Sequence, residues 1–518
     1  MADTHQRPTT PGAPTALGRD DIANLLTGRL TQQQPAVPAP APAPPSAQSG
    51  QTSPTAVPKL AGLPGELPVG WEVIEALQAE VSTLLSRHDP NRMLEESDRR
   101  ALARSLTTQT VAEWSAKYAQ GNAPLSADQE AAIGTAVFNA MYRGGRLQAL
   151  LDEDGVEDLS VDGLRAHVEY YDRPRRTIER VADSHEELIT WVNRMAQLSG
   201  HGERALTQAS PMVGFRMPDG SRVTASLLTS RPSVVIRKHR IRDDGIKELV
   251  DWGALNPVIA HFLIACVRAR MNVLVVGDMG SGKTTLLRGL GREIPPEERV
   301  VTLESDRELY LDEPARNGRP GPLTFAFEAR QSNGERGRDG SLEGEISIAD
   351  MFVTALRYNA TRVIVGEVRS KEVVPMLHAM SAGGSGSMCT LHVRRPHAII
   401  SRLVQLCTEA GMAVDSANHL IASSIDVVVY LTYLDETGQG GRKHRFVSHI
   451  YEVHDVVGEG GMPTTSTLFA PTATERRAVW QQMPSFIEDL ETKAGFQRAW
   501  LTHQPHAHWG PPLTTARP

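Results

Sequence analysis

Residues 272–290 read NVLVVGDMGSGKTTLLRGL. The centre of this stretch, residues 277–284, matches the phosphate-loop pattern G-x-x-x-x-G-K-[ST], with a β-branched run before it and a helical run after it. In such a strand–loop–helix unit the glycines let the backbone curl, so that several N–H groups point at nucleotide phosphates beside a helix N-terminus. The alternative is a glycine-rich turn without a ligand, but the flanking strand and helix favour a nucleotide site.

Two side chains of this loop are expected to contact the phosphate end of the nucleotide. Lys283 would reach the β- and γ-phosphates, and the hydroxyl of Thr284 would bind Mg²⁺. The sequence therefore predicts ATP and Mg²⁺ as cofactors. The other predicted nucleotide-binding positions are Gly277, Asp278, Met279, Gly280, Ser281, Gly282 and Thr285.

Polar residues stand at the ends of three later predicted strands: Glu304, Glu367 and His392. Ligands of open parallel sheets bind beyond the carboxyl ends of the strands, so these side chains are expected beside the phosphate loop. A carboxylate there can bind Mg²⁺ or activate the attacking water, and a histidine can donate a hydrogen bond to the γ-phosphate. Taken singly, each is more often a surface, capping or satisfied structural residue. Their joint placement favours a catalytic site.

The chain of 518 residues is too long for one hydrophobic core, so several domains are expected. Residues 1–68 are predicted to be a disordered Pro/Ala-rich tail, 69–147 a helical bundle, and 148–242 a smaller α/β N-terminal domain. Over residues 243–456, β-branched runs alternate with helical stretches, which predicts an α/β domain with a parallel sheet and a final antiparallel hairpin. Residues 457–518 are expected to hold a loop, short helices and a tail.

Composition excludes several classes of protein. A net charge of −7 and an aromatic content of 5% make nucleic acid an unlikely partner. The 3 cysteines form no CxxC pair, which excludes a disulfide scaffold and a tetracysteine zinc site. No apolar run is long enough to span a membrane and the first residues have no signal-like apolar region, so we expect a cytoplasmic protein that reaches a membrane only through partners.

Several segments together resemble the traffic ATPases of type II and type IV secretion, with the closer likeness to the TadA/CpaF-like ATPases of Tad/Flp pilus assembly. VVTLESDREL is similar to the family's Asp box, ALRYNATRVIVGEVR to its atypical Walker B region and AMSAGGSGSMCTLH to its His box. Upstream, PMVGFRMPDGSRVTA and SVVIRKH are similar to strands that carry arginines. The resemblance implies a RecA-like P-loop ATPase domain that works as a homohexameric ring docked on inner-membrane platform proteins.

The resemblance also implies roles for individual residues. Glu304, in the Asp box with Glu308, is the first candidate for the water-activating carboxylate, and Glu367 is the Walker B glutamate and a Mg²⁺ ligand. His392 is the His-box histidine. Arg222 and Arg237 would reach the nucleotide from the N-terminal domain, with Arg216 a weaker candidate and Arg369 following the Walker B glutamate. An arginine can stabilise the transition state of phosphoryl transfer, although a lone arginine is more often in a surface salt bridge.

Four positions depart from the family pattern: Ser305, residues 359–361 (Asn-Ala-Thr), Gly384 and Gly214. The predicted function is Mg²⁺-dependent ATP hydrolysis that powers Tad/Flp pilus assembly or a related secretion system. The alternatives are a type IV secretion or conjugation ATPase, a RecA-like nucleic-acid translocase and a low-turnover nucleotide-binding regulator. Which of Glu304 and Glu367 is the general base stays open at this stage.

Overall fold

A computed structural model of the chain describes residues 67–91, 93–199, 205–238, 245–315, 318, 320–330, 344–503, 509 and 513. The tail expected over residues 1–68 lies outside the described residues, apart from its last two positions. The described chain divides into two compact units. Residues 67–238 belong to the N-terminal unit, and residues 245–436 and 443–503 to the C-terminal unit.

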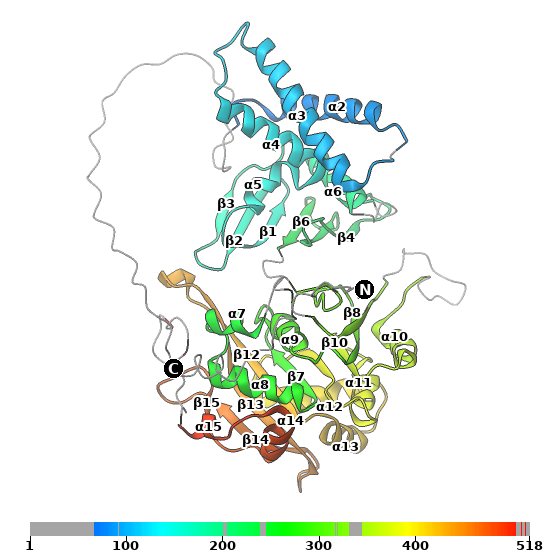
Figure 1. The fold of residues 1–518 in the computed structure, drawn as a ribbon, viewed down its shortest axis with the longest axis vertical. Helices are drawn as coiled ribbons and strands as arrows, with labels where there is room; N and C mark the ends of the chain where they lie inside the picture. The colour runs from blue at the N-terminus through cyan, green and yellow to red at the C-terminus, as the bar shows by residue number, and fades with distance from the viewer. Residues whose placement is uncertain are drawn as a thin grey trace, which may run out of the picture. The chain divides into compact units, whose positions relative to one another are not determined.

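The N-terminal unit begins with three packed helices, α2 (Trp71–His88), α3 (Glu96–Tyr118) and α4 (Ala127–Tyr142), as expected (Figure 1). Helical spacing buries the side chains of Ile74, Leu77, Val81 and Leu85 on one face of α2. A capping box begins α4: Ser126 accepts a hydrogen bond from the backbone N–H of Gln129, whose side chain accepts from the backbone N–H of Ser126. The helical bundle predicted from the sequence is confirmed.

An antiparallel sheet follows, with strand order β3-β2-β1-β6-β5-β4. One face of this sheet is apolar and packs against α6 (His185–Leu198), whose N-cap is Ser184. The opposite face carries the alternate, more polar residues of each strand. Short helices η1 (Gly145–Leu147) and α5 (Gln148–Leu151) lead into the sheet. The strands are β1 (Val156–Asp162), β2 (Arg165–Tyr170), β3 (Arg176–Ile178), β4 (Met212–Arg216), β5 (Arg222–Ser226) and β6 (Ser233–Arg237).

The C-terminal unit is built on a nine-stranded sheet with the order β15-β14-β13-β12-β7-β11-β10-β8-β9. The six strands from β12 to β9 in this order are parallel, and β13, β14 and β15 extend the sheet in antiparallel fashion. Strand β11 separates the phosphate-loop strand β7 from β10. The strands are β7 (Val273–Gly277), β8 (Arg299–Glu304), β9 (Leu323–Glu328), β10 (Arg362–Val368), β11 (Met388–His392), β12 (Val427–Asp435), β13 (Lys443–Val457), β14 (Pro463–Ala470) and β15 (Val479–Trp480).

Helices cover both faces of this sheet, which is why β7 is buried throughout. Val273 and Val275 point into one core with the first group of helices, and Leu274 and Val276 into the other core with the second group. The first group is α7 (Ile246–Asp251), α8 (Pro257–Arg268), α9 (Lys283–Gly291), α14 (Ile487–Ala494) and α15 (Ala499–His503). The second group is α10 (Ile348–Ala355), α11 (Val373–Ser381), α12 (Ile399–Glu409) and α13 (Val414–Ser424).

The predicted hairpin is present. Strands β12 and β13 pair in antiparallel fashion, with Val427 opposite Glu452 at one end and Asp435 opposite Lys443 at the other, and η4 (Thr437–Gln439) lies in the connection. The structure differs after residue 456, where a loop was expected. Thr-rich residues form β14, with Pro463 as its first residue, a position where a missing N–H is tolerated. Strand β9, at the far edge of the sheet, was also not predicted.

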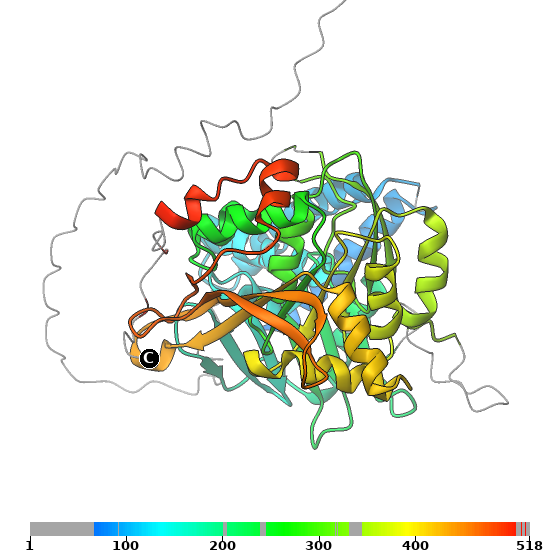
Figure 2. The same cartoon turned by 90° about the horizontal axis from the view of Figure 1, so that it is seen from below.

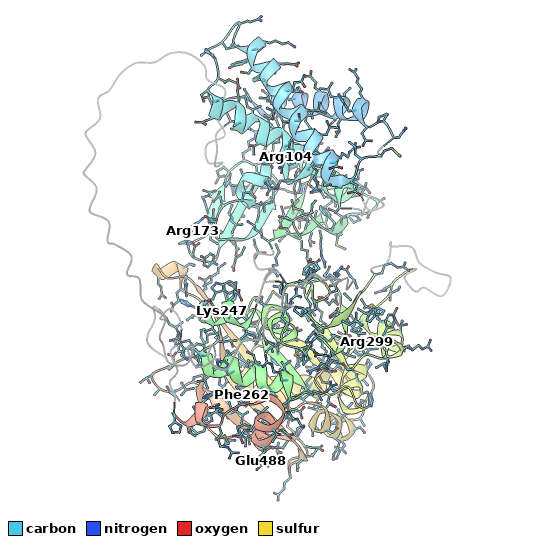
Figure 3. All side chains as sticks on the ribbon, viewed as in Figure 1. Arg104, Arg173, Lys247, Phe262, Arg299 and Glu488 are labelled. Carbon is cyan, nitrogen blue, oxygen red and sulfur yellow. The ribbon has the colours of Figure 1, made fainter. Side chains whose placement is uncertain are left out.

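The C-terminal helices α14 and α15 lie beside α8 (Figure 2). Phe262 of α8, labelled in Figure 3, is fully buried. It contacts the rings of Phe469, Phe486 and Phe496, so the chain from β14 onward contributes to the core of the C-terminal unit. Within the part of the chain that the structure describes, no helix combines the length and the apolar character needed to cross a bilayer.

Candidate functional site

The phosphate loop lies between β7, which ends at Gly277, and α9, which begins at Lys283 (Figure 1). Its backbone requires glycine at several points. Gly280 and Gly282 have φ angles of 72° and 89°, in the left-handed region that L-residues avoid. A Cβ atom on Gly277 would lie 2.5 Å from the carbonyl oxygen of Leu431, so a side chain there would collide with the neighbouring strand. The glycines of the motif therefore permit the loop conformation that anion binding needs.

Lys283, His392 and Glu367 form a continuous chain of polar contacts at the carboxyl ends of β7, β10 and β11. Lys283 Nζ lies 2.9 Å from the carbonyl oxygen of Asp278 and 3.1 Å from His392 Nδ1. His392 Nε2 lies 2.8 Å from Glu367 Oε1, and the guanidinium of Arg369 pairs with Glu367 Oε2. If the ammonium of Lys283 donates to Nδ1, the ring of His392 carries its proton on Nε2 and donates it to Glu367.

Burial and charge tune the two ends of this chain. Burial lowers the pKa of Lys283 from 10.5 to about 8, although the carboxylates of Glu367 and Asp278 act in the opposite direction. Burial alone would raise the pKa of Glu367, but hydrogen bonds from His392 and Arg369 outweigh it and lower this pKa to about 2. Glu367 is therefore ionised at neutral pH, and Lys283 is a cation that loses its proton as the pH rises through about 8.

Glu304 ends β8 at the same edge of the sheet, but its carboxylate already has partners. Its side chain is 1% exposed, and Oε2 accepts hydrogen bonds from the backbone N–H groups of Glu308 (2.7 Å) and Leu309 (2.9 Å). A Cβ atom on Gly366 would lie 3.1 Å from Glu304 Cγ, so the glycine of β10 leaves room for this side chain. Glu304 thus fixes the turn that follows β8.

That turn presents Glu308, whose residue is half-buried, while the neighbouring Leu309 is fully buried. The turn continues into Tyr310, which has a φ of 48°, an uncommon conformation for a bulky residue that often marks a functional region. Arg292 holds this backbone by donating to the carbonyl oxygen of Tyr310 at 2.7 Å. The pKa of Arg369 is raised mainly by its hydrogen bond to Glu367 and less by the carboxylates of Asp306 and Glu308. Asp306 and Glu308 therefore lie within electrostatic range of the Glu367–Arg369 pair.

The positions that depart from the family pattern have distinct local settings. Asn359 adopts a left-handed φ of 53°, which asparagine tolerates better than most residues. At Gly384 a Cβ atom would overlap the carbonyl oxygen of Ala379, so a histidine would not fit without movement of the loop. Nothing in the structure explains the glycine at position 214, where the nearest atom to an added Cβ is 3.9 Å away.

Three arginines lie in one row in the N-terminal unit. Arg216 on β4 stands opposite Arg222 on β5, and Arg222 stands opposite Arg237 on β6. Directly opposed residues share a face of the sheet, and like charges opposed in this way are destabilising by themselves. At the end of the row, Arg237 Nε donates to Asp158 Oδ1 at 2.9 Å. The sequence singled out Arg222 and Arg237, and the register adds Arg216 as an equal member of this concentration of positive charge.

Arg445 is a residue of the site that the sequence did not indicate. It lies on β13, more than 160 residues after the loop, yet its Nε donates to the carbonyl oxygen of Gly280 at 2.7 Å. The sequence predicted the hairpin that carries Arg445, but not that this hairpin lies beside the phosphate-loop strand.

The donor set fits Mg²⁺ in the way nucleotide sites bind it. Among the described residues, no group of three or more His, Cys, Asp or Glu side chains could hold a metal ion by itself. Mg²⁺ in nucleotide sites takes one or two protein oxygens and completes its shell with phosphates and water, so a dedicated cage is not needed. Thr284 in the first turn of α9 and Glu367 at the end of β10 offer a hydroxyl and a carboxylate of this kind.

Comparison with known families gives this geometry a family context. The family model described as type II/IV secretion system protein (T2SSE) matches residues 162–458, more than half of the chain. The chain belongs to this family. The matched residues include the phosphate loop, the Asp-box turn and the contacts between Lys283, His392 and Glu367. They also include the whole of residues 243–456, the region predicted to be a RecA-like ATPase domain.

Individual relatives share parts of this region. The type IV secretion system protein PtlH of Bordetella pertussis is 33% identical over 186 residues, which are 35% of this chain and 50% of PtlH. The putative conjugal transfer protein Rv3659c of Mycobacterium tuberculosis is 29% identical over 299 residues, 55% of this chain and 79% of that protein. The VirB11 ATPase of Brucella suis, a solved structure, is 20% identical, with a TM-score of 0.30 over 59% of this chain and 92% of VirB11. The chain spans at most half the length of the first curated relatives it matches.

Proposed function

We propose that this member of the type II/IV secretion family hydrolyses ATP with Mg²⁺ and uses the energy to drive motion in a secretion or pilus machine. The observation that carries the proposal is the contact chain from Lys283 through His392 to Glu367, placed beside a P-loop at the carboxyl edge of the sheet. A lysine, an imidazole and a carboxylate in this order suit a triphosphate and its metal better than they suit a structural core.

The phosphate loop binds the nucleotide through its backbone N–H groups and the first turn of α9. Lys283 contacts the β- and γ-phosphates once it exchanges its present partners, Asp278 and His392, for phosphate oxygens. Thr284 and Glu367 hold Mg²⁺, which supplies electrostatic stabilisation of the charge that develops on the phosphates. The low pKa of Glu367 fits this role because a metal ligand must be ionised at the working pH.

The same low pKa makes Glu367 a poor general base, because proton transfer is most efficient when the pKa of the base lies near the working pH. Glu304, our first candidate from the sequence, has its Oε2 bonded to two backbone amides and is 1% exposed. We therefore assign the activation of water to Glu308, which the turn presents at this edge, and the positioning of Glu308 to Glu304.

His392 contacts both Lys283 and Glu367, so it is suited to sense the γ-phosphate and its loss. The arginine row supplies Arg222 and Arg237, with Arg216, as the cations that stabilise the transition state from the N-terminal domain. A lone arginine in a salt bridge would not need two arginine neighbours in register, and this grouping supports an anion as their common ligand.

The finer assignment is to Tad/Flp pilus assembly, in a homohexameric ring docked on inner-membrane platform proteins, with the chain in the cytoplasm at the inner face of the membrane. It rests on the sequence resemblance of the Asp, Walker B and His boxes. A type IV secretion or conjugation ATPase is the second candidate, favoured by the match to PtlH, a type IV secretion system protein. Pilin and platform genes beside the gene of this protein would support the first assignment, and conjugation genes the second.

The hydrolysis itself is tested by steady-state phosphate release with ATP and Mg²⁺. We expect turnover by the wild type and none by Lys283→Ala, with Arg402→Ala, on the partly exposed face of α12, as a control. Wild-type turnover no higher than that of Lys283→Ala would contradict the proposed motor function and favour a low-turnover nucleotide-binding regulator. Strong stimulation by DNA, lost at raised salt, would instead favour a nucleic-acid translocase.

A further inference from the structure

The outer side of the phosphate loop is contacted by the β12–β13 hairpin. Strand β12 pairs with β7 up to Leu431 opposite Gly277, and β13 places Arg445 opposite Tyr433 of β12. The register of two neighbouring strand pairs therefore brings a β13 side chain alongside the loop. The guanidinium of Arg445 lies over the ring of Tyr433, 5.2 Å from its centroid, which limits its freedom.

Arg445 meets the loop at two points. Its Nε donates a hydrogen bond of 2.7 Å to the carbonyl oxygen of Gly280. Its aliphatic stem lies along the next turn of the loop, because a Cβ atom on Gly282 would be 3.6 Å from Arg445 Cδ. The arginine thus packs against the loop and also fixes the direction of one carbonyl group.

The direction of this carbonyl determines the direction of the next amide. In a trans peptide the C=O of Gly280 and the N–H of Ser281 point to opposite sides. With the carbonyl held toward β13, the N–H of Ser281 faces the inside of the loop, where it donates to the carbonyl oxygen of Asp278 at 3.3 Å. That same carbonyl accepts from Lys283 Nζ, the group expected to bind phosphate. The Ser281 amide is therefore directed to the side of the loop that binds the anion.

We propose that Arg445 is a positioning residue for nucleotide binding, which holds the Gly280–Ser281 peptide so that the Ser281 N–H meets the bound phosphates. This inference rests on the proposed function, since it assumes that the loop binds a nucleotide. Without the arginine, the peptide after Gly280 loses the bond that holds its carbonyl and keeps a long bond from its N–H to Asp278, so its amide must be ordered further each time a nucleotide binds. The cost falls on affinity, because Arg445 acts on the loop and not on the reacting atoms.

The test measures ADP affinity and the ATPase parameters of Arg445→Met, which keeps most of the stem and removes the donor. A hydrogen bond from a charged donor corresponds to roughly a tenfold change in an equilibrium constant, so we expect the Kd for ADP to rise about tenfold. KM for ATP should rise in the same direction, with kcat changed less than about threefold, because the transition-state contacts of the γ-phosphate remain. Arg445→Lys keeps a cation without the fixed Nε–H and should show a smaller rise in Kd.

Arg402→Met is the matched control, since Arg402 lies on α12 and makes a long surface pair with Glu409, at 3.9 Å. Thermal unfolding without nucleotide separates positioning from stability: a purely structural Arg445 would lower the unfolding temperature and leave the Kd of the folded protein unchanged. If the methionine variant does not fold, the lysine variant carries the comparison. Wild-type affinity in both folded variants would overturn the inference about Arg445 alone, whereas a wild type that binds no ADP would overturn the proposed function.

Discussion

Replacement of Glu304 separates a positioning carboxylate from a catalytic one. Its Oε2 accepts two backbone hydrogen bonds, at 2.7 and 2.9 Å, in a setting where the side chain is 1% exposed. Glu304→Ala leaves both amides without their acceptor, and each unsatisfied buried donor costs about 1–3 kcal/mol. With the cavity left by the side chain, we expect a loss of about 3–5 kcal/mol in the free energy of unfolding. Glu304→Gln keeps an acceptor oxygen of the same shape and should lose only about 1–2 kcal/mol.

The assay pairs denaturant unfolding with steady-state phosphate release, and its matched variant is Glu308→Gln. We expect Glu308→Gln to keep the wild-type unfolding midpoint and the KM for ATP and to lose about 10²–10⁴-fold in kcat, the contribution typical of a general base. Glu304→Gln should show the opposite pattern, with reduced stability and a loss in kcat of less than about tenfold. A Glu304→Gln variant that unfolds like the wild type but has no turnover, beside an active Glu308→Gln, would refute the assignment and return the base to Glu304.

Four further outcomes test other residues of the site and of the core that supports it. Burial lowers the pKa of Lys283 from 10.5 to about 8, so its charge is lost as pH rises through about 8 and ADP affinity should fall above that pH. The unfolded chain holds this proton up to about pH 10.5, so the free energy of unfolding should rise between pH 8 and 10.5. Lys283→Met should remove both trends. Glu367→Gln should keep ADP binding in EDTA but lose the gain in affinity that Mg²⁺ gives to the wild type, and an unchanged gain would exclude Glu367 as a metal ligand. Arg362 is fully buried against Glu298 and donates to it at 2.7 Å, so Arg362→Met should cost about 3–5 kcal/mol in denaturant unfolding, and a joint change to Arg362→Met with Glu298→Leu should cost less than the sum of the two. Gly384→His should lower stability by about 1–3 kcal/mol through overlap with Ala379, and a wild-type unfolding midpoint would show that the loop adapts.

The phosphate loop and the edge of the sheet could be predicted from the sequence because both follow from short-range patterns. The motif fixes the strand, the turn and the helix around Lys283, and alternating β-branched runs fix the parallel strands that end at Glu304, Glu367 and His392. Since the carboxyl ends of parallel strands share one edge, the grouping of polar ends required no further information. The chain from Lys283 to His392 and Glu367 agrees with that reasoning.

The roles of Glu304 and Glu308 could not be predicted, because they depend on where the backbone amides point after the strand ends. From the sequence, Glu304 is the first candidate for the base and Glu367 the alternative, and nothing in the pattern favours Glu308. The difference arises in the turn after β8, where the N–H groups of Glu308 and Leu309 donate to Glu304 just before Tyr310 adopts its left-handed φ of 48°. A tyrosine gives no sequence signal for this conformation, unlike a glycine.

Long-range pairing explains the other misses. Strand β9 was not predicted because its short run lies among Gly and Pro residues, and only its parallel pairing with β8 makes it a strand. Residues 463–470 were expected to be a loop for the same reason, and they form β14 because β13 offers a free edge beside them. Arg445 belongs to this class too, since its contact with Gly280 follows from the register of β12 on β7 and of β13 on β12.

His392 is the one residue of the polar chain described above that contacts both the phosphate-loop lysine and the carboxylate of Glu367. Its Nδ1 contacts the lysine that would hold the γ-phosphate, and its Nε2 contacts the carboxylate that would hold the metal. Any ligand that draws Lys283 away from Nδ1 removes the donor that fixes the ring tautomer, and the hydrogen bond to Glu367 must adjust with it. Because Glu367 is also paired with Arg369, whose side chain is 60% exposed, a change at the phosphate loop reaches the surface in three contacts. Turning hydrolysis into motion requires that the two states of the nucleotide make different contacts with the protein, and under the proposed function this polar relay would supply that difference.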